Sequence, residues 1–195
     1  MSYHSQFNED RFIVENLASL LPLEGFFVDV GAYDGVASSN TLAFEELGWR
    51  GICIEPDPDI SNQCRTKRSA FTFTCAIGTG EKLFQPFHIN RSDRGTSGLR
   101  REPTGESILV PVRELSNIID LWNPPSLDLL SIDTEGSELE VWLSRGRWDP
   151  KVVIIEFLTE PGGSRLERIR EQLEFDKYRL VHTTHANAIF VPEGK

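Results

Sequence analysis

The stretch GFFVDVGAYDG, residues 25–35, decides the fold that this sequence predicts. Its apolar run 26–30 is typical of a buried strand, and the turn after it is bounded by Gly31 and Gly35. The segment 36–48 follows with apolar residues at helical spacing, so strand, turn and helix succeed one another. Ligands of open α/β sheets bind beyond the carboxyl ends of the strands, and this turn is expected at such an end.

Further apolar runs alternate with helix-period segments through the rest of the chain. Strands are predicted at 50–56, 70–78, 127–133, 151–157, 178–184 and 186–192. Helices are predicted at 8–21, 57–67, 114–122, 136–146 and 164–175. This alternation predicts one α/β domain, residues 1–195, with a mostly parallel sheet and helices on both faces.

Residues 80–112 differ from this pattern. The part 88–107 is polar and rich in turn-forming residues, with arginines at 91, 94, 100 and 101. It is too long for a simple connection, so we expect an insertion that is either a substrate loop or a small hairpin. The segment 108–112 is expected to be an edge strand, because Pro111 cannot donate to a central ladder.

Composition excludes several kinds of partner. The chain has 195 residues and a formal net charge of −10, and such a surface repels the phosphates of nucleic acids. No apolar segment approaches the roughly 20 residues of a membrane span, and the first residues lack the pattern of a signal peptide. The three cysteines, Cys53, Cys64 and Cys75, form no CxxC pair and are expected to be reduced, as in a cytoplasmic protein.

The first turn favours a ligand without phosphate. A dinucleotide-binding turn would need another glycine between Gly31 and Gly35, and Asp34 would repel a pyrophosphate. S-adenosylmethionine fits better, because glycines let the backbone approach closely and Asp29 can receive the ammonium directly or through water. Glu55 ends the next strand and is placed to accept both ribose hydroxyls.

The ends of the second and third strands complete the expected cofactor site. Small side chains of CAIG, residues 75–78, are expected to flank the adenine. The full set of expected cofactor-binding residues is Asp29, Gly31, Tyr33, Asp34, Gly35, Asn40, Glu55, Pro56, Asp57, Ala76, Ile77 and Asp133.

Two long segments resemble the FkbM-type methyltransferases, a family that uses S-adenosylmethionine. They are FFVDVGAYDGVASSNTLAFEELGWRGICIEPDP, residues 26–58, and LDLLSIDTEGSELEVW, residues 127–142. The opening SQFNEDRFI, residues 5–13, and NAIFV, residues 187–191, are also similar to segments of that family. No part of 80–107 shares the resemblance.

The resemblance implies a fold and a reaction. The fold is the Rossmann-like class I methyltransferase sheet, with seven strands that are mostly parallel and the last one antiparallel. The reaction is O-methyl transfer to a hydroxyl of a sugar, glycan or other natural-product acceptor. The resemblance also implies cofactor roles for Asp29, Gly31, Gly35 and Glu55, and places Asp133 and Glu135 at the reacting end.

Three carboxylates are expected to gather at the rim of the fourth and fifth strands. Asp133 and Glu135 follow one strand, and Glu156 lies in the next. Three roles stay open: one carboxylate acts as general base, or the three bind Mg²⁺ or Ca²⁺, or they cap a helix and bind the acceptor and cofactor. His185, between the last two strands, is a further candidate base, and the plainer interpretation is a solvated turn residue.

The sequence does not choose the acceptor. The arginines of 91–101 either recognise an anionic acceptor or belong to a solvated loop, because acidic residues are interleaved with them. A small molecule or a glycan is the expected partner, and a second copy of the chain could complete the acceptor site in a homo-oligomer. The rival hypothesis is a non-catalytic nucleoside-binding or partner-docking module on the same fold.

Overall fold

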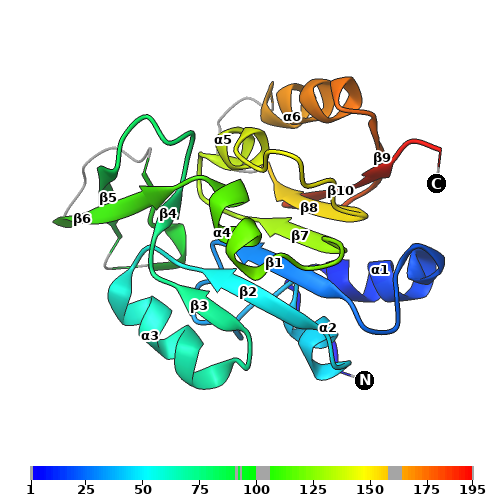
Figure 1. The fold of residues 1–195 in the computed structure, drawn as a ribbon, viewed down its shortest axis with the longest axis horizontal. Coiled ribbons are helices and arrows are strands. Elements are labelled where there is room, and N and C mark those ends of the chain that lie inside the picture. The colour runs from blue at the N-terminus through cyan, green and yellow to red at the C-terminus, as the bar shows by residue number, and fades with distance from the viewer. Residues whose placement is uncertain (1, 91, 93, 100–105, 158–163, 195) are drawn as a thin grey trace.

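The computed structural model describes residues 2–90, 92, 94–99, 106–157 and 164–194. Within these ranges a seven-stranded sheet forms the centre of the molecule (Figure 1). Its order is β3 (Phe71–Phe73), β2 (Arg50–Ile54), β1 (Phe26–Val30), β7 (Leu129–Ile132), β8 (Val152–Glu156), β10 (Asn187–Pro192) and β9 (Tyr178–Thr183).

The direction of the strands confirms the predicted sheet. Parallel pairing runs from β3 through β2, β1 and β7 to β8. The last strand, β10, is antiparallel to both of its neighbours, β8 and β9. The mostly parallel α/β fold with an antiparallel last strand is therefore observed.

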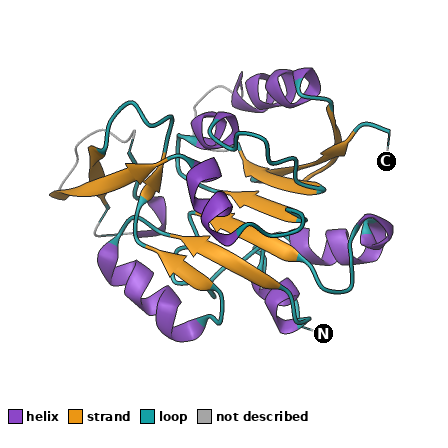
Figure 2. Ribbon diagram, viewed as in Figure 1, coloured by secondary structure: helices purple, strands orange, loops and turns teal. Residues whose placement is uncertain are grey.

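Helices cover both faces of the sheet, as predicted (Figure 2). One face carries α4 (Leu115–Trp122), α5 (Glu138–Leu143) and α6 (Ser164–Phe175). The other face carries α1 (Glu9–Asn16), the 3₁₀ turn η1 (Ala18–Leu20), α2 (Leu42–Glu46) and α3 (Pro58–Lys67). Both faces are thus shielded from water, which explains why the sequences of the strands are nearly continuous apolar runs.

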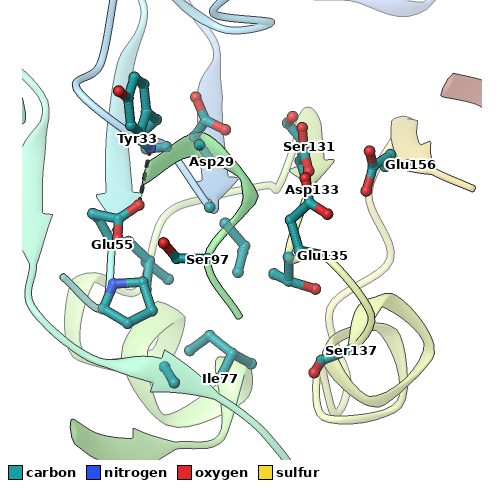
Figure 3. A pocket seen from close by; sticks show the side chains of 18 of the residues that line it. Asp29, Tyr33, Glu55, Ile77, Ser97, Ser131, Asp133, Glu135, Ser137 and Glu156 are labelled. Atoms are coloured by element: carbon teal, nitrogen blue, oxygen red, sulfur yellow. Dashed lines mark hydrogen bonds between the residues drawn. The ribbon is translucent and has the colours of Figure 1, made fainter. Parts of the chain in front are cut away.

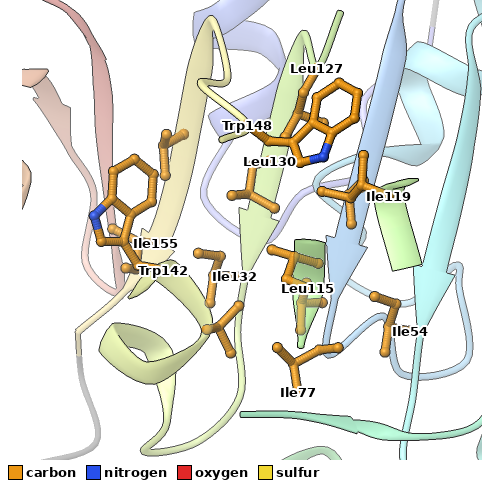
Figure 4. Packing of buried hydrophobic residues seen from close by; sticks show 14 of the residues in the cluster. Ile54, Ile77, Leu115, Ile119, Leu127, Leu130, Ile132, Trp142, Trp148 and Ile155 are labelled. Carbon is orange, nitrogen blue, oxygen red and sulfur yellow. The ribbon is translucent and has the colours of Figure 1, made fainter. Parts of the chain in front are cut away.

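A large core cluster lies on the α4–α6 face. Figure 4 shows Leu115 of α4 and Trp142 of α5 near Ile132 and Ile155 of the sheet. All four side chains are at most 1% exposed, and burying each large apolar side chain contributes roughly 1.5–3 kcal/mol to stability.

Strand β1 supplies side chains to both core clusters. Phe26, Val28 and Val30 point to the α4–α6 face, whereas Phe27 points to the α1–α3 face. Because side chains alternate along a strand, Asp29 shares the face of Phe27. A carboxylate is therefore placed beneath the loop that leads into α2.

The insertion forms a second, three-stranded sheet with the order β4 (Ala76–Ile77), β6 (Glu106–Arg113) and β5 (Phe84–Ile89). Within 80–112, β5 and β6 pair as an antiparallel hairpin, and a substrate-binding role of this insertion stays a prediction. The prediction of an edge strand at 108–112 is wrong, because β6 is the middle strand. The N–H of Val112 donates to the Leu83 carbonyl on the β5 side, so the nitrogen of the preceding Pro111 faces the β4 side. On that side β4 pairs only with Val112 and Arg113, so Pro111 has no ladder bond to donate.

The predicted strand 70–78 divides into β3 and β4, which belong to different sheets.

The segment 36–48 is less helical than predicted, since α2 contains only Leu42–Glu46. Side chains hold the preceding loop in another conformation. Asp34 Oδ1 accepts the N–H groups of Val36 and Ala37 at 2.9 and 2.8 Å. Ser39 Oγ accepts those of Thr41 and Leu42 at 3.3 and 3.2 Å. Such local bonds compete with helix formation.

The predicted cap of the helix after β2 is confirmed. Asp57 caps α3, because its Oδ1 accepts the N–H of Asp59 at 3.0 Å. Cys53, Cys64 and Cys75 are buried and free. In the described part of the chain, every helix is too short or too polar to cross a bilayer.

Candidate functional site

A cavity of about 360 Å³ opens at the carboxyl ends of the central strands. Val30 of β1, Ile54 of β2, Asp133 after β7 and Glu156 of β8 all contribute to its wall. Figure 3 shows Asp29 and Glu55 on one side and Asp133, Glu135 and Glu156 on the other. A cavity is therefore present where the sequence predicts the site, at the carboxyl ends of the strands, and the predicted carboxylates lie together around it.

The two glycines of the first turn are needed for packing within the protein. Both have positive φ, 83° at Gly31 and 81° at Gly35. A Cβ on Gly31 would collide with the backbone carbonyl oxygen of Asp133, and one on Gly35 would lie 2.6 Å from Cγ of Arg68. Gly31 lines the cavity, whereas Gly35 lies behind it. The structure therefore gives Gly35 a role in building the loop and leaves it outside the cavity lining.

Asp29 is held at the floor of the cavity and is 4% exposed. Its Oδ2 accepts a hydrogen bond from the Thr41 hydroxyl at 2.6 Å. Burial raises the pKa of Asp29, while the Arg68 guanidinium and the Thr41 bond act in the opposite direction. Asn40, the neighbouring predicted residue, also lines the cavity and donates to Ser131 Oγ at 3.2 Å.

Glu55 is fixed by backbone donors. One carboxylate oxygen accepts the N–H of Tyr33 at 3.1 Å (Figure 3). The other oxygen accepts the N–H of Asp57 at 2.8 Å. Burial raises the pKa of Glu55 to about 8. A carboxylate oxygen has about two lone-pair sites, so each oxygen retains acceptor capacity toward the cavity.

The three carboxylates Asp133, Glu135 and Glu156 offer oxygens that lie within 4.8 Å of one another. Burial raises the pKa of Asp133 to about 7, and the negative charge of Glu135 adds to that effect. Glu135 has a φ of 55°, in the left-handed region, and precedes Gly136. The turn between β7 and α5 therefore holds a strained acidic residue at the cavity wall.

Glu138, which the sequence analysis did not select, organises this turn. It is fully buried, and its Oε1 accepts the N–H groups of Thr134 at 3.1 Å and Gly136 at 2.9 Å. It also forms an ion pair with Arg165 of α6. An acidic residue in the first turn of a predicted helix was the available signal for such a capping role.

The end of β4 supplies an apolar wall. Ala76 and Ile77 line the cavity, as predicted, together with Cys75 and Pro56. The segment 94–99 of the insertion also reaches the cavity, through Arg94, Gly95, Thr96, Ser97 and Leu99. Arg94 lies 3.3 Å from Asp59 of α3 and 3.6 Å from Asp57, the cap of that helix, so two acidic side chains share its charge. Predicted arginines 91, 100 and 101 lie outside the described residues.

Besides Gly35, three predicted site residues lie outside the cavity lining. Asp34 binds its own loop and pairs with Lys67 at 2.6 Å. Asp57 caps α3. His185 is exposed and packs edge-on against Phe7, with 5.5 Å between ring centres. The structure therefore does not bring His185 to the reacting centre.

Two further polar residues, Gln6 and Ser137, line the wall, and of these Ser137 had no signal in the sequence. Gln6 borders the cavity from the segment before α1. Ser137 lines the cavity and is 3% exposed, and its hydroxyl has no hydrogen-bond partner among the described residues. A buried hydroxyl of this kind is available to a ligand.

Comparison with known proteins adds a family and a fold. Residues 29–180 match the family described as the methyltransferase FkbM domain. No curated protein sequence matches the chain. A solved structure of a proposed RNA methyltransferase from Pyrococcus horikoshii is similar, with a TM-score of 0.51 and 14% identity over 95% of this chain and 83% of that one. A TehB-like S-adenosylmethionine-dependent methyltransferase from Corynebacterium glutamicum gives a TM-score of 0.47 and 12% identity over 97% of this chain and 89% of that one.

Proposed function

The chain belongs to the FkbM methyltransferase family, and on that premise we propose that it methylates a hydroxyl oxygen of a sugar, glycan or other natural product. Methyl transfer from S-adenosylmethionine follows from the family and from the methyltransferase fold. The choice of oxygen and the class of acceptor are our proposal. The observation that carries it is the meeting of Asp29, Glu55 and Asp133 in one cavity.

The described residues fit the methyl donor. Glu55 presents two oxygens that each have one backbone donor, which leaves acceptor capacity for the two hydroxyls of a ribose. Asp29 provides a buried negative charge suited to an ammonium group, and Ala76 and Ile77 provide a small apolar wall suited to an adenine. When bound, S-adenosylmethionine supplies an activated methyl group on a positively charged sulfur.

Asp133 is our candidate for the general base that removes the proton of the acceptor hydroxyl. Burial and the nearby charge of Glu135 raise the pKa of Asp133 to about 7, which is close to the value that favours proton transfer at neutral pH. Its backbone packs against Gly31 of the first turn, and its carboxylate belongs to the acidic cluster. The remaining task of the chain is to align the acceptor and to exclude water.

A second role for the acidic cluster has its own support. Oxygens of Asp133, Glu135 and Glu156 lie within 4.8 Å of one another, a spacing that a shared Mg²⁺ or Ca²⁺ ion could bridge. Such an ion would bind the acceptor hydroxyl and lower its pKa. The third role stays open as well, because Asp133 and Glu135 lie in the turn that leads to α5, which begins at Glu138. We place the reaction in the cytoplasm as part of the proposal, because the buried cysteines are free.

Labelled methyl transfer tests the proposal. The wild type and Asp133→Asn would be incubated with radiolabelled S-adenosylmethionine and a panel of sugars, glycans, natural products and RNA, with and without EDTA. We expect transfer to a hydroxylated acceptor, and we expect Asp133→Asn to lower kcat by roughly 10²–10⁴-fold with little change in the affinity for S-adenosylhomocysteine.

Each arm of this experiment separates alternatives. Loss of activity in EDTA with recovery on adding Mg²⁺ or Ca²⁺ would assign the cluster to a metal. Equal losses of kcat and of cofactor affinity in Asp133→Asn would make Asp133 a binding residue. Cofactor binding without transfer to any acceptor would favour the non-catalytic module, and transfer to RNA alone would overturn the acceptor class.

A further inference from the structure

Arg68 is a fully buried cation that lies behind the cofactor side of the cavity. It follows the last residue of α3, and its side chain is 0% exposed. Its guanidinium donates to Glu45 Oε2 at 2.9 Å, to the Gly35 carbonyl at 2.8 Å, to Ser39 Oγ at 3.2 Å and to Thr41 Oγ1 at 3.0 Å. The donors of a guanidinium lie in one plane, so four partners hold the group in a fixed orientation. We call Arg68 with these four partners the Arg68 hub.

Three of these partners belong to the loop 35–41, between the first turn and α2. The same loop forms a wall of the cavity through Ala37, Ser38, Ser39 and Asn40. Arg68 therefore ties the loop to the end of α3 from behind. The short α2 helix is tied to the same hub, because Glu45 also accepts the N–H groups of Ser69 and Ala70 at 2.7 and 3.2 Å.

Thr41 extends the hub to the site. Its hydroxyl accepts a hydrogen bond from Arg68 at 3.0 Å and donates its own proton to Asp29 Oδ2 at 2.6 Å. Because a hydroxyl has a single proton, the bond from Arg68 fixes the direction of the bond to Asp29. Arg68 is thus linked to Asp29 through a single hydroxyl, although it does not line the cavity itself.

The charges around Asp29 agree with this arrangement. Burial raises the pKa of Asp29 and the charge of Arg68 counteracts it, whereas Glu45 adds to the effect of burial. Cys53, Cys64 and Asp133 are the other titratable groups that interact with Asp29. Arg68 is the positive charge that these interactions place beside the carboxylate.

We propose that Arg68 is a positioning residue that adapts the cavity to the amino-acid end of the methyl donor, by holding Thr41, Asp29 and the loop 35–41 in one geometry. The inference rests on the proposed function, since it assumes that Asp29 receives the ammonium group. The inference also predicts that Arg68 affects binding of the amino-acid end of the ligand more than binding of its nucleoside end. Among the described residues, the guanidinium donates to Glu45, Gly35, Ser39 and Thr41, and not to Glu55, Ala76 or Ile77 at the proposed nucleoside end. Glu55 is held instead by backbone N–H groups.

Ligands with and without the amino-acid end test this selectivity. S-adenosylhomocysteine and adenosine would be titrated by calorimetry into the wild type, Arg68→Met and Arg68→Lys. The matched control is Arg65→Met, one turn earlier on α3, where the arginine donates to the Thr72 carbonyl and the Thr74 hydroxyl. We expect Arg68→Met to bind S-adenosylhomocysteine roughly tenfold or more weakly, as is typical when a hydrogen bond to a charged group is lost, and to bind adenosine within about threefold of the wild type.

The variants separate a positioning role from a purely structural one. Arg68→Lys is expected to recover part of the lost S-adenosylhomocysteine affinity, because it restores the charge with fewer donors. Arg65→Met is expected to bind both ligands as the wild type does. A loss of the same size for both ligands in Arg68→Met, or no loss at all, would overturn the inference. Should Arg68→Met fail to fold, the same comparison in Arg68→Lys decides. Failure of the wild type to bind S-adenosylhomocysteine would instead overturn the proposed function.

Discussion

Glu55 is a buried carboxylate whose ionisation opposes folding while the cavity holds no ligand. Burial raises the pKa of Glu55 from 4.5 to about 8. Between these values the unfolded chain releases the proton and the folded chain retains it, so the unfolded state binds fewer protons. The free energy of unfolding therefore falls as the pH rises through this window. Below the lower value both states are protonated, and the contribution of Glu55 to stability is fully present.

The substitution Glu55→Gln tests this linkage. Gln can still accept a backbone N–H, and it removes the ionisation. We expect the unfolding temperature of the ligand-free variant to fall less between about pH 5 and about pH 8 than that of the wild type. Thermal unfolding followed by circular dichroism measures this, with Glu15→Gln, an exposed residue of α1, as the control. A slope remains in Glu55→Gln because Asp133 also has a raised pKa. Identical slopes for wild type and Glu55→Gln would contradict the prediction.

The connections that form the cavity contain residues in the left-handed region. Tyr33 and Ser38 in the loop between β1 and α2 have φ values of 50° and 56°, and Glu135 between β7 and α5 has 55°. A non-glycine residue pays roughly 1–2 kcal/mol for this conformation. All three residues line the cavity, so strain is concentrated where a ligand would bind.

Glu135 allows the strain to be measured. We expect Glu135→Gly to have a higher free energy of unfolding than Glu135→Ala, by roughly 1 kcal/mol, because glycine adopts a positive φ without the Cβ penalty. Both variants remove the same charge, so their difference isolates the backbone. Urea unfolding at neutral pH provides the comparison. Equal stabilities, or a more stable Ala variant, would show that the turn relaxes and stores no strain.

The elements differ in how far the sequence could predict them. Asp29 and Glu55 could be found because each lies in or directly after an apolar strand, which is a local pattern. Arg68 could not, because its partners lie 23 to 33 residues away along the chain and come together only in the fold. The length of the helix expected at 36–48 was overestimated, because the side chains of Asp34 and Ser39 accept hydrogen bonds from backbone N–H groups of this segment. Local hydrophobic spacing cannot report such competition.

The second sheet shows another reason why a prediction from sequence can fail. Pro111 was a valid signal that one side of its strand lacks a ladder bond. The sequence could not show that the neighbouring β4 is only two residues long, which lets a proline occupy the middle strand. A rule about single residues therefore failed because the length of a partner strand decided the outcome.

The molecule as a whole is acidic, and its cavity is lined by carboxylates. The net charge is −10, and Asp29, Glu55, Asp133, Glu135 and Glu156 all border the cavity. A field of this sign attracts a cation over a distance set by the ionic strength. S-adenosylmethionine carries a net positive charge at neutral pH, whereas S-adenosylhomocysteine, which has lost the sulfonium charge, is neutral overall. The proposed cofactor and its product should therefore respond differently to salt.

We expect the affinity for S-adenosylmethionine to fall more than the affinity for S-adenosylhomocysteine when the ionic strength rises from about 0.02 M to about 0.2 M, because screening weakens only the interaction with net charge. Calorimetric titrations at the two KCl concentrations measure the ratio of the affinity for S-adenosylmethionine to the affinity for S-adenosylhomocysteine. Uncharged adenosine serves as the control for general salt effects. A salt-independent ratio would mean that local contacts alone distinguish donor from product. A falling ratio would mean that the acidic surface helps the site to prefer the charged donor and to release the neutral product after each transfer.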